Sequence, residues 1–130
     1  MKKNNQKYRV TLTEDKLRLI ADCVEDCCRF AAGQMELQHT TALSEHNNEI
    51  VDELEKLQPY MTPGLPRGAS YDWAGNHCQD EGQRRFIAMT YAIYREIRHR
   101  LVVDHGIDNV YSSPTLTCAD GGELPIIEKL

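Results

Sequence analysis

The stretch TEDKLRLIADCVEDCCRFAAG, residues 13–33, decides the fold because it holds both the start and the periodic interior of a helix. Thr11 and Glu14 have the spacing of a capping box, and Thr13 is an equally good N-cap, so the helix should begin near Thr13. Gly33 either ends this helix in a left-handed conformation or lies within a longer helix where another segment approaches closely. Apolar residues recur at steps of three and four and predict one buried stripe: Leu17, Ile20, Val24, Cys27 and Ala31.

Two further helices are expected downstream. Ser44 is placed to cap the second helix and Pro59 to end it, and its inner face would consist of Ile50, Leu54 and Leu57. The third helix is predicted to begin near Asp80 or Glu81 and to end at Gly106. Its core stripe should contain Phe86, Met89, Ile93, Ile97 and Leu101.

A small sheet completes the predicted fold. Residues 8–12 alternate apolar and polar side chains, which is the period of a half-buried strand. Short extended segments at 110–111, 115–118 and 124–127 are candidates to pair with it. The fold class is therefore predicted to be α+β, mainly helical, with a three-helix core and a sheet that joins the two ends of the chain. Between the second and third helices, residues 59–80 are rich in Pro and Gly and predict a long irregular loop.

Size and composition place the chain among ordinary globular proteins. Its 130 residues suffice for one domain, residues 1–130, with 41% hydrophobic and 27% charged residues. No segment approaches the roughly 20 apolar residues of a membrane helix, and the first seven residues lack the apolar core of a signal peptide. An odd number of cysteines suits a reducing compartment with free thiols: Cys23, Cys27, Cys28, Cys78 and Cys118. We expect a cytoplasmic protein that has no membrane partner.

The charge is unevenly distributed along the chain. The net charge of −5 argues against general nucleic-acid binding, which depends on clustered Lys and Arg. Residues 14–58 contain eleven acids against four bases, whereas residues 84–100 contain five arginines against Glu96. The third helix is thus the basic part of the sequence.

This helix has a second face, about a third of a turn from its core stripe, that mixes rings with guanidinium groups. Its members are Arg84, Ile87, Tyr91, Tyr94, Arg95 and Arg98. Arginine pairs with phosphate or carboxylate and tyrosine stacks on a base, so this face, with Tyr71 and Trp73 from the long loop, predicts a site for an anionic, nucleotide-like ligand. Arg29, on the outer face of the first helix, is a further candidate. The alternative is structural: the arginines pair with the acidic helices and the tyrosines pack at the surface.

Three other patterns allow metal chemistry. Asp22-x-x-Glu25 and Glu49-x-x-Asp52 loosely resemble the paired acidic motifs of helical nucleotide pyrophosphohydrolases, which hold Mg²⁺, but outer-surface charge is the default interpretation. The E-x-x-H motifs that end at His39 and His99 are interpreted as solvated surface. Cys23 and Cys27 are interpreted as small buried apolar residues rather than as zinc ligands.

Several segments resemble small uncharacterised proteins of bacteriophages and prophages. They are Leu12-Thr13, Leu17, Ile20, RFAAGQ (29–34), GASY (68–71), YAIYREIRH (91–99) and LPI (124–126). The resemblance implies an accessory protein that binds a host molecule. We therefore expect a non-enzymatic, self-associating protein that needs no cofactor and binds a nucleotide-like ligand, such as a host defence signal. The alternatives are a metal-dependent pyrophosphohydrolase and an inhibitor of a host protein.

Overall fold

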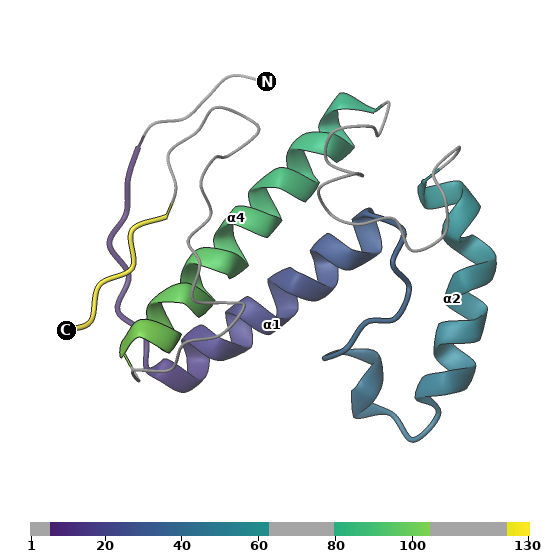
Figure 1. Ribbon diagram of the computed structural model, residues 1–130, viewed down its shortest axis with the longest axis horizontal. Coiled ribbons are helices and arrows are strands. Elements are labelled where there is room, and N and C mark those ends of the chain that lie inside the picture. The colour runs from purple at the N-terminus through teal and green to yellow at the C-terminus, as the bar shows by residue number, and fades with distance from the viewer. Residues whose placement is uncertain (1–5, 63–79, 105–124) are drawn as a thin grey trace.

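The computed structural model describes residues 6–62, 80–104 and 125–130, and three α-helices dominate this part of the chain (Figure 1). They are α1 (Glu14–Ala31), α2 (Asn47–Met61) and α4 (Glu81–Asp104), and a 3-10 turn, η1 (Thr41–Leu43), precedes α2. In Figure 1, α1 and α4 lie side by side and run in opposite directions, while α2 is set apart from the pair. Within the described ranges, no helix is long and apolar enough to cross a membrane.

The ends of α1 follow from local sequence signals. The Thr13 side chain accepts a hydrogen bond from the backbone N of Lys16 at 3.5 Å, which confirms Thr13 as the N-cap. At the other end Gly33 adopts a φ of 83°, and its backbone N donates to the carbonyl oxygen of Phe30 at 3.0 Å. The backbone N of Gln34 donates to the oxygen of Arg29 at 2.8 Å. These two bonds form a Schellman motif, the left-handed ending that a glycine permits.

The other two helices agree with the predictions in position and differ in detail. Asp80 caps α4, because its carboxylate accepts from the backbone N of Gln83 at 2.8 Å, and the helix begins at Glu81 as expected. The predicted end at Gly106 lies outside the described residues. α2 continues past Pro59 to Met61, because a proline removes one N–H donor and Thr62 still donates to Gln58 at 2.9 Å.

The buried face of each long helix differs from the predicted stripe. Ile20, Phe86 and Met89 were expected in the core, but they are 38%, 46% and 46% exposed, and Cys27 is also exposed. Small residues of α1 instead allow α4 to approach closely: the Cys28 sulfur lies 3.6 Å from the carbonyl oxygen of Ile87. The core cluster consists of Ala21, Cys28, Ala31, Ala32, Ile87, Tyr94, Ile97 and Leu101.

The predicted inner face of α2 is also wrong, because most of its residues are exposed. Ile50 and Leu57 of its expected inner face are 36% and 52% exposed, and Leu54 is half-buried. Ser44 accepts from the backbone N of His46 at 3.0 Å and so caps the turn before the helix rather than the helix itself.

The predicted sheet is not found in the described residues. Residues 6–13 and 125–130 contain no strand, and Tyr8 and Val10 are 85% and 71% exposed. An alternating pattern becomes a strand only when a neighbour pairs with its backbone and covers its apolar face, and no such neighbour is found within the described ranges. The candidate segments 110–111 and 115–118 lie outside the described residues. The described part of the chain is therefore all-helical.

Candidate functional site

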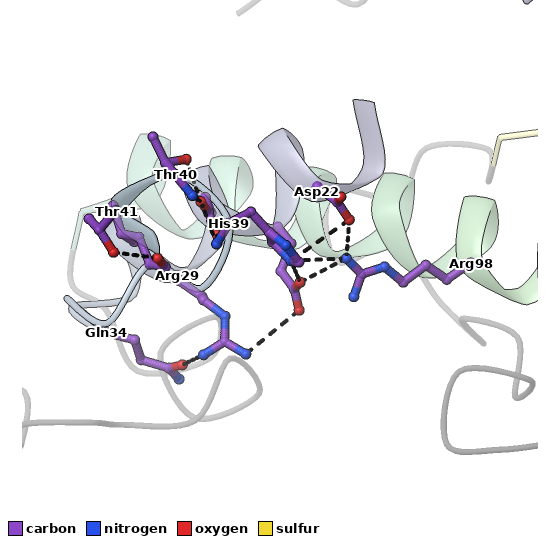
Figure 2. Close-up of polar contacts among 10 residues, drawn as sticks. Asp22, Arg29, Gln34, His39, Thr40, Thr41 and Arg98 are labelled. Carbon is purple, nitrogen blue, oxygen red and sulfur yellow. Dashed lines mark hydrogen bonds and ion pairs between the residues drawn. The ribbon is translucent and has the colours of Figure 1, made fainter. Parts of the chain in front are cut away.

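A buried carboxylate, Glu25 of α1, is the centre of a polar cluster that joins three segments of the chain. Figure 2 labels the other members of this cluster: Asp22, Arg29, His39 and Arg98. The Oε1 of Glu25 lies 2.9 Å from Nη2 of Arg98 on α4 and 2.7 Å from Nε2 of His39 in the α1–η1 connection. Its Oε2 lies 3.6 Å from Nη2 of Arg29, and Arg98 also donates to Asp22 at 2.8 Å. We call Asp22, Glu25, Arg29, His39 and Arg98 the Glu25 cluster.

The contacts of His39 determine where its ring carries a hydrogen. An ionised carboxylate only accepts hydrogen bonds, so the 2.7 Å contact with Glu25 requires a hydrogen on Nε2 of His39. Arg98 Nη2 is 3.2 Å from the same nitrogen, and two donors can lie this close because the Glu25 oxygen accepts from both. The cluster also pairs two carboxylates, Asp22 and Glu25, with two guanidinium groups, Arg29 and Arg98.

Asp26, the residue after Glu25, holds the α1–η1 connection in place. Its side chain is 4% exposed and accepts from the backbone N of Thr40 at 2.6 Å, from the Thr40 hydroxyl and from the backbone N of His39 at 3.3 Å. The Thr41 hydroxyl donates to the carbonyl oxygen of Leu37 at 2.5 Å, which tightens the same turn. This anchoring places His39 over Glu25.

The same connection forms one wall of an apolar pocket of about 550 Å³. The pocket has the volume of a small-molecule site. Its polar side chains are engaged within the protein: Asp26 as described, and Gln83, whose Nε2 donates to the carbonyl oxygens of Ala31 and Met61 at 2.7 Å each. Within the described ranges the lining residues are Cys23, Asp26, Cys27, Phe30, Ala31, Leu37, Thr40, Met61, Gln83 and Phe86, and none of these is basic.

Three of the predicted ligand residues have structural partners inside the protein. Tyr94 is 2% exposed and belongs to the core, and the Arg98 guanidinium lies 5.5 Å from the centre of its ring. Arg98 and Arg29 form ion pairs in the Glu25 cluster. For Arg98 these pairs agree with the structural alternative, in which the arginines pair with the acidic helices, except that its partner Glu25 is buried rather than on the outer face of α1. A part for these residues in ligand binding stays a prediction.

The remaining predicted residues on α4 lie on the same face of the helix as Arg98. Arg84, Tyr91 and Arg95 are half-buried, at steps of seven and four that place them on one face. The Arg95 guanidinium lies 5.7 Å from the centre of the Tyr91 ring. Tyr71 and Trp73 lie outside the described residues.

The carboxylates of the two candidate Mg²⁺ motifs have different surroundings. Glu49 and Asp52 are exposed on α2, while Asp22 and Glu25 are engaged with Arg98 and His39. Among the described residues, no group of three or more His, Cys, Asp and Glu side chains could hold a metal ion.

The interpretation of Cys23 and Cys27 as small buried residues is wrong. Cys23 and Cys27 are exposed and only Cys28 is buried, because α1 turns its small residues toward α4. These three are free thiols, as predicted; Cys78 and Cys118 lie outside the described part.

Sequence reasoning missed the inward orientation of Glu25 and the contribution of His39. The available signal was a stripe of small residues, Ala21, Cys28 and Ala32, at steps of seven and four, with Glu25 on the same line. A charged residue within such a stripe must find partners from another segment, because an isolated buried charge is too costly.

Comparison of the chain with protein-family models, with curated proteins and with solved structures finds no match.

Proposed function

We propose that the protein binds a small anionic, nucleotide-like ligand without chemically changing it, as a phage or prophage accessory protein that sequesters a host signal. The observation that carries this proposal is the shared face of Arg84, Tyr91 and Arg95 on α4, where a guanidinium group lies 5.7 Å from a ring centre. Guanidinium groups pair with phosphate oxygens in a two-pronged geometry, and a tyrosine ring stacks on a base. Both parts of a nucleotide find a suitable group on this face.

The layer beneath this face supports its geometry. The rings of Tyr91 and Tyr94 meet edge to face, with centres 5.6 Å apart and an interplanar angle of 83°. Tyr94 is buried, and Arg98 over its ring is fixed by Asp22 and Glu25. In the proposal, Tyr94 and Arg98 therefore orient Tyr91, and Arg84 and Arg95 contact the ligand.

A hydrolytic role has less support from the described residues. A Mg²⁺-dependent pyrophosphohydrolase needs several carboxylates that converge on one point. Here Glu49 and Asp52 are exposed on α2, whereas Glu25 is engaged by Arg98 and His39. We therefore base the proposal on binding.

The test uses calorimetry to measure the unfolding temperature of the protein in the presence of each member of a panel of cyclic nucleotides and ADP-ribose derivatives. A ligand at 100 times its dissociation constant stabilises the folded state by about 2.7 kcal/mol, so at least one member should raise the unfolding temperature. Arg84→Ala and Arg95→Ala should each weaken binding about tenfold, because each removes a charge-assisted hydrogen bond. Arg18→Ala is the matched control, since Arg18 pairs with Glu14 on an exposed part of α1. A panel without any shift, or wild-type affinity in both variants, would contradict the proposal.

We also propose that the chain self-associates. The supporting observation is the apolar surface of α2, where Ile50, Leu57 and Tyr60 are 36%, 52% and 84% exposed. Light scattering after gel filtration should show an oligomer for the wild type and a monomer for Leu57→Glu. A monomeric wild type would contradict self-association and would favour the alternative in which this surface binds a host protein.

A further inference from the structure

Two thiols share the apolar pocket. Cys23 and Cys27 are one helical turn apart on α1, both are exposed and free, and both line the pocket. Side chains at positions i and i+4 of a helix are neighbours, with Cβ atoms about 5–6 Å apart. Both sulfur atoms are therefore placed to reach one small bound atom without a change in the backbone.

The rest of the pocket restricts what that atom can be. Among the residues that the structure describes, no histidine lines the pocket, and the Asp26 carboxylate accepts hydrogen bonds from the backbone and hydroxyl of residues 39–40. A hard cation such as Mg²⁺ or Ca²⁺ prefers oxygen ligands, whereas thiolates select soft ions. Two thiols alone leave a coordination position open, and apolar side chains, among them Phe30, Leu37 and Phe86, surround it.

We propose that Cys23 and Cys27 form a dithiol site for a trivalent, thiophilic metalloid that carries an apolar substituent. The two sulfur atoms occupy two of the three positions around the metalloid, and the substituent occupies the pocket. With phenylarsine oxide as the probe, two As–S bonds form, the As–O bond breaks, and the two thiol protons leave with the oxygen as water. Arsenic stays trivalent, so the step needs no oxidant or reductant.

The first measurement is protection of the thiols from N-ethylmaleimide in the folded protein. Cleavage after Arg18 and Arg29 gives a peptide of residues 19–29 that contains Cys23, Cys27 and Cys28. One equivalent of phenylarsine oxide should abolish labelling of Cys23 and Cys27 together. Cys28 is the internal control: burial raises the pKa of its thiol to about 11, so it should remain unlabelled with or without the probe. Unchanged labelling of Cys23 and Cys27 in the presence of the probe would overturn the proposal.

Binding of the probe to single-thiol variants and to a pocket variant distinguishes a dithiol pocket from the ordinary reactivity of a single thiol. Cys23→Ser and Cys27→Ser should each bind phenylarsine oxide about 100-fold more weakly, because the second bond to a dithiol is intramolecular, and excess glutathione should then remove the probe. Cys28→Ser should bind like the wild type. Phe30→Ala should weaken binding of phenylarsine oxide about tenfold and leave binding of inorganic arsenite unchanged, since only the former has a ring to bury. Equal affinity of the wild type and both single-thiol variants would overturn the site, and circular dichroism checks that each variant is folded.

Discussion

At the scale of single residues, Gly33 combines a positive φ with the absence of a Cβ atom, and its position requires both. Its positive φ of 83° ends α1, and a Cβ atom at this position would lie 2.5 Å from Oγ1 of Thr62 and 3.1 Å from Nε2 of Gln58. Of the two alternatives left open by the sequence, the left-handed cap is confirmed, and the longer helix is wrong because α1 ends at Ala31. Another segment does approach Gly33 closely, namely the end of α2.

Gly33→Ala should lower the free energy of unfolding by about 2 kcal/mol or more, because backbone strain at positive φ adds to a steric clash with Thr62. Urea denaturation measures this change. The matched control is Gly82→Ala in the first turn of α4, where the nearest atom to a Cβ is Asp80 Oδ2 at 3.5 Å. That variant should be neutral or stabilised by up to about 1 kcal/mol, since alanine favours a helix. Equal losses in both variants would contradict this account.

Cys28 should make stability depend on pH in the alkaline range. Burial raises the pKa of its thiol from 9.0 to about 11. Below pH 9 the folded and unfolded chains both hold the proton; between pH 9 and 11 the unfolded chain loses it first, so stability falls as pH rises. Across this window the wild type should lose up to about 2–3 kcal/mol more than Cys28→Ala. Cys23→Ala, at an exposed position, should keep the wild-type slope; the same slope in Cys28→Ala would contradict the prediction.

At the scale of elements, one amide links three helices. Gln83 is in the first turn of α4, and its Nε2 donates to the last turns of both α1 and α2, at the carbonyl oxygens of Ala31 and Met61. These carbonyl groups at the ends of helices lack a partner within their own helix. Because α2 has few contacts with the α1–α4 pair, we regard this amide as a principal attachment of α2.

Gln83→Glu should detach α2, because a carboxylate of the same shape faces two carbonyl oxygens and cannot donate to them. We expect a loss of about 2–3 kcal/mol in unfolding free energy. Hydrogen exchange should show faster exchange of the α2 amides, while the α1 and α4 amides keep more of their protection. Gln38→Glu makes the same chemical change at an exposed position and should alter neither quantity. Unchanged exchange in α2 of the Gln83 variant would contradict the attachment.

At the scale of the whole molecule, the Glu25 cluster ties together α1, α4 and the α1–η1 connection. Glu25 is buried, and the groups that pair with its carboxylate come from sequence positions 29, 39 and 98. This arrangement fixes the register of α4 along α1, and through His39 it fixes the connection that forms one wall of the apolar pocket.

Glu25→Gln should destabilise the fold by about 3 kcal/mol, because it removes the buried charge that compensates Arg29 and Arg98. Urea denaturation at neutral pH measures this loss. Glu14→Gln is the control, since it removes an exposed carboxylate that pairs with Arg18 at 3.4 Å and should change stability by about 0.5 kcal/mol or less. Equal effects of the two substitutions would show that the cluster contributes no more than a surface pair.

The proposed ligand site was only partly predictable. The steps that relate Arg84, Tyr91 and Arg95 are a property of helical geometry, so their common face could be derived from the sequence. Tyr94 and Arg98 follow the same spacing, yet the first is buried and the second is ion-paired, because α1 packs against that side of α4. The sequence pattern alone contains no information about which side the neighbouring helix covers.

The sequence by itself determined where α1 and α4 begin and offered the left-handed end of α1 as one of two alternatives, whereas α2 runs past the predicted end at Pro59 to Met61. Thr13, Gly33 and Asp80 act on backbone groups within a few residues, so their effect is local and can be read without the fold. Only the tertiary structure decided which face of each helix is buried. A helix with apolar residues on two sides has no local preference between them, and the close approach allowed by the small residues of α1, together with the distant partners of Glu25, selects one.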